Sequence, residues 1–315
     1  MAEILTIIAP VFLIMMLGYG LGKTSLFPEG TSAILITFVW YVAIPALMFR
    51  SLAPKEFPSS DDLLFVFAYY SALYIVYALA YWLSRISFKL NSAEGGIFAL
   101  NTCFANGVFV GVPVLEGMYG EEGVRLLLIL LSFHSMTLLP VTTVILERAL
   151  NKPDTEGSVA GRIMDNILHN PILIALAVGL TWSALSLPFP DWLDRLAALP
   201  GQAASPVGLF AAGLALSNVR VAGNLAHASL AIGLKLLLLP VFVFAVTEYV
   251  FALPAMWVGT ATIMAALPAG MIGYSFASQY GVGARRAATT VLLSTALSAI
   301  SLTIVLMFFK GELQF

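Results

Sequence analysis

Long apolar runs separated by short polar connections extend along the whole chain. Each run has roughly 20 residues, the length that an α-helix needs to cross about 30 Å of hydrocarbon. This pattern predicts an all-α integral membrane protein with ten transmembrane helices, at residues 4–22, 31–51, 62–83, 93–118, 123–147, 166–187, 201–218, 226–247, 254–279 and 286–309. The longest polar connection, residues 147–165, lies near the middle of the chain and predicts a solvent-exposed loop.

Composition supports a membrane protein and excludes several functions. Hydrophobic residues make up 60% of the chain and charged residues only 10%, whereas a soluble domain carries about 25% charged residues. No basic run points to a nucleic-acid partner. No HExxH, GxSxG, Walker A or CxxC pattern points to an enzyme, a metal or another cofactor. The single cysteine, Cys103, cannot form an internal disulfide and is interpreted as a small packing residue.

The two halves of the chain resemble each other at a shift of 161 residues. This shift aligns the following pairs: Pro10 with Pro171, Gly18 with Gly179, Pro45 with Pro206, Phe49 with Phe210, Tyr119 with Tyr280, Gly120 with Gly281 and Arg125 with Arg286. It predicts a five-helix repeat over residues 1–147, a linker at 148–165 and a second repeat over 166–315. Because five is odd, the second repeat is inverted, which is typical of secondary transporters. The alternative is a coincidence of common membrane composition.

Lysine and arginine positions predict the orientation in the plasma (inner) membrane. With the N-terminus outside, nine of these residues lie on the inner side and five on the outer side. Positive residues favour the cytoplasmic side. The count therefore places both termini outside and the middle loop in the cytoplasm.

Helix four contains an interrupted stretch, "NTCFANGVFVGVPVLEGMYG", at residues 101–120. Gly107 and Gly111 each weaken a helix by about 1 kcal/mol, and Pro113 by about 3 kcal/mol. These residues predict a break at 106–113 and a second half-helix that begins near Pro113. In helix nine, "TATIMAALPAGMIGYSFASQYG" predicts a second break at 268–273. The alternative is that "GVFVG" only permits close helix packing.

Paired breaks in corresponding helices are typical of a transporter binding site. Because the repeat is inverted, the N-termini of two half-helices are expected to meet near the midplane. Free N–H groups and a partial positive charge at each N-terminus suit an anion such as a carboxylate, and two asparagines can add amide donors. The predicted substrate-binding residues are Asn101, Asn106, Gly107, Gly111, Pro113, Pro268, Gly270, Gly273 and Tyr274.

Three ionisable residues are candidates for coupling transport to H⁺ or Na⁺, and the choice of ion stays open. Glu116 either takes part in coupling or is solvated near the outer interface with Glu121 and Glu122. Lys235 is either functional, because an unpaired charge in the membrane is costly, or extends its side chain toward the interface. His134 is either a proton carrier or a hydrogen-bonded packing residue.

The segments "IAPVFLIMMLGYGLGK", "LITFVWYVAIPALMFRSLA", "NTCFANGVFVGVPV" and "AALPAGMIGYSFASQYG" resemble, in this order, the auxin efflux carrier family. This family includes plant PIN-type carriers and prokaryotic carriers of malonate, malate and related acids. It shares a superfamily with the bile acid:sodium symporters. The resemblance covers nearly the whole chain and is carried by the order and spacing of the segments.

The resemblance implies a scaffold of helices 1, 2, 6 and 7, and a transport domain of helices 3–5 and 8–10 that moves like an elevator. It implies a homodimer through helices two and seven. Asn106 and Pro113 match the crossover positions of helix four, and Pro268 matches that of helix nine. Plant carriers have proline where this chain has Gly107, and an asparagine that "PAGMIGY" lacks, so the resemblance favours a prokaryotic carrier.

The function expected is alternating-access transport of small organic anions, either auxin-like or mono- and dicarboxylates, by a protein embedded in membrane lipids. A sodium-coupled symporter of the bile-acid type is the alternative. A receptor, from another functional class, would bind such an anion without moving it.

Overall fold

The computed structural model describes residues 2–55, 60–150, 161, 164, 168–217, 219 and 225–311. These residues form helices and no strand. The predicted 148–165 linker lies almost wholly outside the described residues. Seven helices in the described ranges are long and apolar enough to cross a membrane, so the chain is an all-helical, multi-pass membrane protein.

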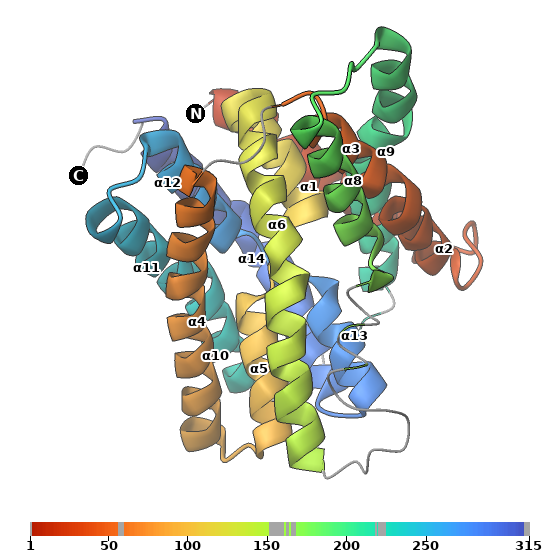
Figure 1. Ribbon diagram of the computed structural model, residues 1–315. Coiled ribbons are helices and arrows are strands. Elements are labelled where there is room, and N and C mark those ends of the chain that lie inside the picture. Colours follow the sequence, from red (N-terminus) through yellow and green to blue (C-terminus); the bar gives the residue numbers. More distant parts are fainter. Residues whose placement is uncertain are drawn as a thin grey trace.

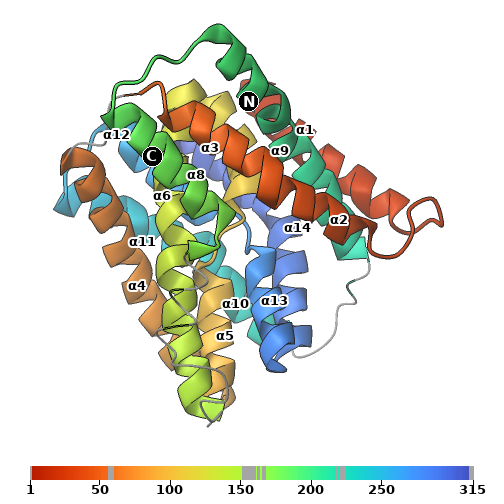
Figure 2. The same ribbon diagram turned by 45° about the vertical axis from the view of Figure 1, so that its right-hand side comes forward.

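One group of helices lies together at the upper right of Figure 1 and extends across the upper part of Figure 2. It consists of α1 (Ala2–Leu21), α2 (Thr31–Phe38), the π-helical turn η1 (Val39–Ala43), α3 (Ile44–Leu52), α8 (Pro171–Ala184) and α9 (Asp191–Ser217). Within this group α9 packs along α1, α2 and α3, and α3 also packs on α8.

The remaining helices form a second group around the long α6. It consists of α4 (Ser60–Phe88), α5 (Ser92–Cys103), η2 (Gly107–Gly111), α6 (Val112–Leu150), α10 (Leu225–Gly233), η3 (Leu234–Leu238), α11 (Leu239–Ala245), η4 (Val246–Val250), α12 (Ala255–Ala266), α13 (Met271–Tyr280) and α14 (Ala284–Phe309). The run 126–131 of α6 is buried at every position, so this helix lies at the centre of the group.

Ten spans are predicted and seven helices of spanning length are observed, for three structural reasons. Predicted helices four and five share one continuous helical stretch, Gly107–Leu150, kinked at Gly120. Predicted helix six is the short α8. Predicted helix nine is divided into α12 and α13.

Helix α9 begins ten residues before its predicted start at residue 201. Asp191 and Asp194 lie in its first turn, where carboxylates interact favourably with the helix dipole. Pro200 and Pro206 lie inside the helix. Both prolines are therefore accommodated within α9.

Three of the four π-helical turns end two residues before a proline. η1 precedes Pro45, η2 precedes Pro113 and η3 precedes Pro240. Proline has no N–H to donate, and its ring clashes with the carbonyl four residues earlier. A turn with i→i+5 hydrogen bonds relieves this conflict without ending the helix.

The outer surface of the second group is apolar. Helix α14 exposes Leu297, Ile300, Ile304 and Phe308, which share one face at helical spacing. Helix α4 exposes Phe67, Ile75, Trp82 and Ile86. A continuous apolar face of this kind suits contact with lipid. The described ends of the chain meet at one end of the molecule, where Lys310 Nζ lies 2.8 Å from Glu3 Oε2.

Candidate functional site

Two interrupted helices meet inside the second group, at residues 104–106 and 267–270, a contact called the crossing below. Both α5 and α12 have 12 residues and end at Cys103 and Ala266. The backbone then leaves the helical conformation, with extended geometry at Phe104 and Leu267. Helical structure resumes at Gly107 in η2 and at Met271 in α13. Each predicted broken helix is thus two half-helices joined by a short irregular segment.

The two irregular segments run antiparallel and bond to each other. The Asn106 N–H donates to the Pro268 carbonyl at 2.9 Å, and the Gly270 N–H donates to the Phe104 carbonyl at 2.8 Å. Ala105 and Ala269 form the bridge between them. A buried, unpaired backbone group is costly. These reciprocal bonds satisfy backbone groups that the breaks release at membrane depth.

The N–H groups of the two bridging alanines bond to side chains of neighbouring helices. The Ala105 N–H donates to His134 Nε2 of α6 at 3.0 Å. The Ala269 N–H donates to Ser294 Oγ of α14 at 3.1 Å. Both partners are buried, so α6 and α14 fix the position of the crossing.

The breaks lie earlier in the chain than the sequence predicts. The irregular residues are 104–106 and 267–270, not 106–113 and 268–273. Gly107 and Gly111 lie in the π-helical turn, and Pro113 lies in the first turn of α6. The predicted break extended to Pro113, but the π-helical turn before this proline accommodates it without ending the helix. Helical structure therefore resumes at Gly107 in the π-helical turn, and the α-helix α6 begins at Val112, next to the predicted start near Val112 and Pro113.

The register of the crossing also differs from the ungapped shift. A shift of 161 aligns Gly107 with Pro268, whereas the bridge pairs Ala105 with Ala269, which are 164 positions apart. The half-helix between Gly107 and the Gly120 kink is longer than α13, which ends at Tyr280. The extra residues before Tyr119 account for the difference.

Four half-helix ends meet at the crossing. The starts of η2 and α13 bring two positive ends, and the ends of α5 and α12 bring two negative ends. Lys235 is fully buried, and its Nζ donates to the Ala265 carbonyl in the last turn of α12 at 3.1 Å. Its side chain therefore does not reach the interface. Its charge lies where it stabilises the negative end of α12.

Several predicted site residues lie together at the crossing. A Cβ at Gly270 would lie 3.0 Å from Phe104 Cδ1, closer than ordinary van der Waals contact. A Cβ at Gly111 would lie 2.7 Å from Leu267 Cδ1. Asn101 packs directly on Gly273 in the first turn of α13. These close contacts bring the two interrupted helices into direct packing.

Other predicted residues lie outside this contact. Glu116 is exposed on α6, nine residues beyond Gly107, or about 14 Å along a helix, at the end of the molecule that holds Arg50 and Glu121. Tyr274 packs on the main apolar core and also on a second cluster that contains Ile97 and Ala277. This position of Glu116 favours the solvated interpretation.

His134 is held by hydrogen bonds at both ring nitrogens. Nε2 accepts from Ala105, so the proton of the neutral ring lies on Nδ1, which is 3.2 Å from Tyr70 Oη. Tyr70 donates its own proton to the Leu130 carbonyl at 2.6 Å. A second proton on His134 would break the bond to Ala105. The geometry therefore favours the hydrogen-bonded packing role over the proton carrier.

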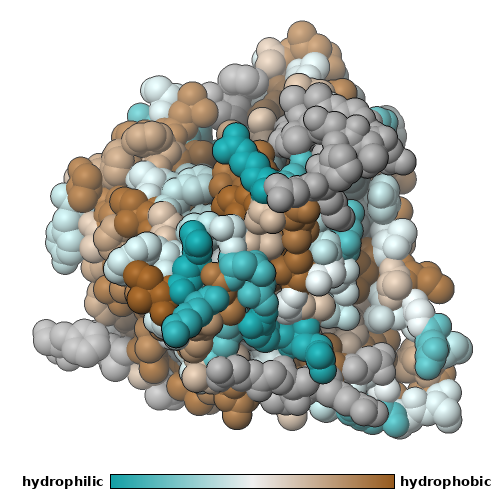
Figure 3. All heavy atoms as spheres, turned by 90° about the horizontal axis from the view of Figure 1, so that it is seen from below, coloured by the Kyte–Doolittle hydropathy of each residue, from teal (hydrophilic) through white to brown (hydrophobic). Residues whose placement is uncertain are grey.

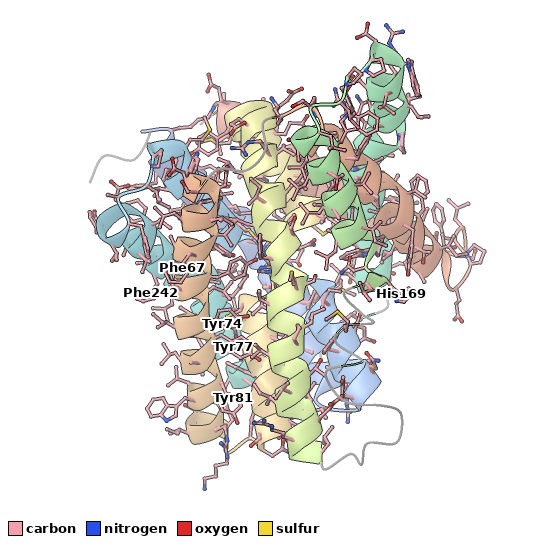
Figure 4. All side chains as sticks on the ribbon, viewed as in Figure 1. Phe67, Tyr74, Tyr77, Tyr81, His169 and Phe242 are labelled. Atoms are coloured by element: carbon pink, nitrogen blue, oxygen red, sulfur yellow. The ribbon has the colours of Figure 1, made fainter. Side chains whose placement is uncertain are left out.

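A row of tyrosines on α4 contacts α5 and α6 near the crossing. Figure 4 shows Tyr74, Tyr77 and Tyr81 one below another along α4. Tyr77 Oη bonds Thr142 Oγ1 of α6 at 2.8 Å, and the Tyr81 ring lies against Gly95 of α5. Tyr70 continues the row at helical spacing. The same face of α4 therefore supports both α6 and the first half of the crossing.

Sequence reasoning missed three features of this region. Ser294 and the two alanines carry no motif, because their role is a backbone contact. Ser205 of α9 donates to the Phe109 carbonyl of η2 at 3.1 Å, which joins the two groups of helices. His227 of α10 and the ion pair of Glu94 with Arg286 lie near Asn101. The ionisable residues at 94, 227 and 286 are a signal that the sequence does contain.

No group of three or more His, Cys, Asp or Glu side chains suited to a metal occurs in the described part of the chain.

Comparison with known proteins identifies the family. Residues 3–306 match the model of the family described as membrane transport protein. The chain belongs to this family. The match confirms the resemblance to auxin efflux carriers and identifies a membrane transporter.

Two relatives align with this membrane transport protein over nearly their whole lengths. A Rhizobium meliloti protein, provisionally named a malonate transporter, is 28% identical over 305 residues, which cover 96% of this chain and 95% of the relative. A Methanothermobacter thermautotrophicus protein, described as an uncharacterized transporter, is 26% identical over 292 residues, or 93% of this chain and 94% of the relative.

Proposed function

We propose that this protein is a secondary transporter of small organic anions that works by alternating access, with substrate bound at the crossing. The reciprocal hydrogen bonds between residues 104–106 and 268–270 carry this proposal. Irregular backbone at membrane depth is tolerated where it is buried or lines a cavity, and it is typical of transporter binding sites.

The chemistry of the crossing suits a carboxylate. The first N–H groups of a helix have no partner within that helix, and two half-helices begin here, at Gly107 and Met271. Asn106 is half-buried, and its carboxamide oxygen makes no capping bond to η2; we propose that its amide N–H groups donate to the ligand. The name of the Rhizobium meliloti relative points to malonate, a dicarboxylate, as the first substrate to test.

The proposal includes the finer architecture. Predicted helices 1, 2, 6 and 7 would form the scaffold, and the crossing would move with helices 3–5 and 8–10 as an elevator. Two five-helix repeats would be inverted, as the antiparallel bridge between their breaks suggests. The scaffold would form a homodimer through predicted helices two and seven, for which Ile34 and Tyr41 offer exposed apolar surface.

The proposed orientation places both termini outside. Arginine and lysine residues gather at the opposite end of the molecule, where α4 and α6 end and α14 begins; in the described ranges they are Arg85, Lys89, Arg148, Arg285 and Arg286. Figure 3, the view from below, shows hydrophilic side chains on that face. Over the whole chain the predicted count is nine basic residues on this side and five on the other, and such an excess marks the cytoplasmic side of an inner membrane.

Replacing Asn106 by alanine tests the site. The substitution removes the carboxamide and keeps the backbone N–H that bonds Pro268. We expect proteoliposome uptake of radiolabelled malonate to fall at least tenfold, equivalent to about 1.4 kcal/mol, with the melting temperature unchanged.

Gln279→Ala is the matched control, because Gln279 is an exposed carboxamide on α13 and its loss should leave uptake intact. Full uptake by Asn106→Ala would reject the site. Uptake that disappears when K⁺ replaces Na⁺ would instead support the sodium-coupled symporter. Binding without counterflow would indicate a receptor.

A further inference from the structure

A small cavity lies between α5, α10 and α14, on the cytoplasmic side of the crossing in the proposed orientation. Its lining includes Glu94, Asn101, His227, Arg286 and Thr290. The volume open to the centre of a water-sized sphere is about 10 Å³. This is about the space that one water molecule needs.

Two buried polar side chains in this cavity have atoms without hydrogen-bond partners in the described structure. Asn101 is 2% exposed and its Oδ1 has none. His227 is 6% exposed, and neither Nδ1 nor Nε2 has one. Leaving such groups unpaired in a protein interior is unfavourable. The cavity therefore suits water or a proton shared between these groups.

The surroundings of His227 contain one charge of each sign. Glu94 of α5 and Arg286 of α14 form an ion pair and both act electrostatically on the imidazole. The ring of Phe88 in α4 packs on His227 with 5.2 Å between the ring centroids. The ring of Phe98 in α5 does so with 4.7 Å between the centroids. These two aromatic rings enclose the imidazole. Glu94 is the nearby anion with which a protonated imidazole could pair.

The two buried histidines differ in one decisive respect. His134 uses both ring nitrogens to hold the crossing, whereas His227 has both nitrogens available. An imidazolium has two N–H donors and needs two acceptors. The enclosed geometry thus suits the neutral His227 ring. Opening the cavity to water would supply the acceptors for the protonated ring.

We propose that His227 is the proton-binding residue of the transport cycle, in the cavity that it shares with Asn101 and beside the Glu94–Arg286 pair. This inference rests on the proposed transport function. A proton from cytoplasmic water binds the lone pair of a ring nitrogen and returns to water on the reverse step, with no other bond made or broken. Asn101 links this cavity to the crossing, because it contacts Gly273 in the first turn of α13.

Proteoliposomes loaded at different internal and external pH test the coupling. We expect wild-type protein to accumulate malonate several-fold more with a pH gradient than without one. His227→Gln should lose this gradient-driven accumulation and keep malonate counterflow, because counterflow needs no net proton movement. Gradient-driven accumulation by His227→Gln, or a wild type that exchanges malonate but ignores the gradient, overturns the proposal.

A second variant tests the counter-ion, and a third is the control. Glu94→Gln keeps the capping box that Glu94 forms with Asn91 and removes the carboxylate, so accumulation should fall while counterflow persists. His169→Gln alters an exposed histidine outside the cavity and should accumulate malonate as the wild type does. Unchanged accumulation by Glu94→Gln would contradict its role as counter-ion.

A measurement of proton binding separates this inference from the proposed substrate. The chain has three histidines, so the ring carbon NMR signal that disappears in His227→Gln is assigned to His227. In nanodiscs we expect this signal to shift between pH 5 and pH 8, the range in which histidine changes charge. A signal that stays constant over this range rejects the proton site. Failure of malonate counterflow in the wild type would reject only the proposed substrate.

Discussion

Two residues without reactive side chains, Ala105 and Ala269, occupy the centre of the crossing. Their N–H groups are buried and bond His134 and Ser294. At residue scale, therefore, the site depends on side chains whose task is to satisfy backbone groups. His134 illustrates this, since a histidine in a membrane helix first suggests proton transfer.

Replacing His134 by phenylalanine should destabilise the protein by about 1–3 kcal/mol, because the buried Ala105 N–H loses its acceptor. Thermal unfolding of the purified protein measures this loss. Ser132→Ala is the control, since Ser132 is equally buried and bonds only the Leu128 carbonyl of its own helix. A His134→Phe variant as stable as the wild type would show that this bond contributes little.

At the scale of the element, glycine and proline have different effects on helices four and five. Pro113 is accommodated by the η2 turn. The direction of the chain changes at Gly120, where φ is 65° and ψ is −152°. This backbone region is essentially restricted to glycine. Gly120 therefore separates the crossing half-helix from the long central part of α6.

Gly120→Ala should destabilise the protein by about 1–3 kcal/mol through backbone strain. No atom lies within 4 Å of the position that the new Cβ would take, so steric crowding does not contribute. Gly20→Ala in α1 is the matched control: its Cβ also meets nothing within 4 Å, and alanine favours a helix. Equal melting temperatures for the two variants would contradict the strain argument.

At the scale of the whole molecule, an elevator movement would have to break the contact between α9 and η2. Ser205 bonds the Phe109 carbonyl there, and the Phe109 ring packs on Gly208. A Cβ at Gly208 would lie 3.0 Å from Phe109 Cγ, and Phe109 Cβ is one bond, about 1.5 Å, from that atom. The two Cβ atoms therefore lie within about 4.5 Å, the range of a disulfide.

A variant with Phe109→Cys, Gly208→Cys and Cys103→Ala should lose malonate uptake when its two new cysteines are oxidised to a disulfide. Reduction of the disulfide should restore uptake. The disulfide would join the two groups of helices across the surface on which the proposed elevator movement would slide them. A disulfide between positions 52 and 179 is the control. A Cβ at Gly179 would lie 3.2 Å from Leu52 Cβ. Both positions belong to the α1–α3, α8 and α9 group, so uptake should continue. Undiminished uptake by the oxidised 109–208 variant would exclude sliding at this contact.

The sequence by itself determined that the chain is a helical membrane transporter and that its fourth and ninth predicted helices are interrupted. Apolar runs of spanning length and paired helix-breaking residues are local properties, so they can be recognised directly in the sequence. Only the tertiary structure decided where the breaks lie, at residues 104–106 and 267–270. A proline can end a helix or be absorbed by a π-helical turn, and packing by neighbouring helices decides which occurs. Packing also decided that His134 has both ring nitrogens bonded and His227 neither, because hydrogen-bond partners distant in sequence have no local signature.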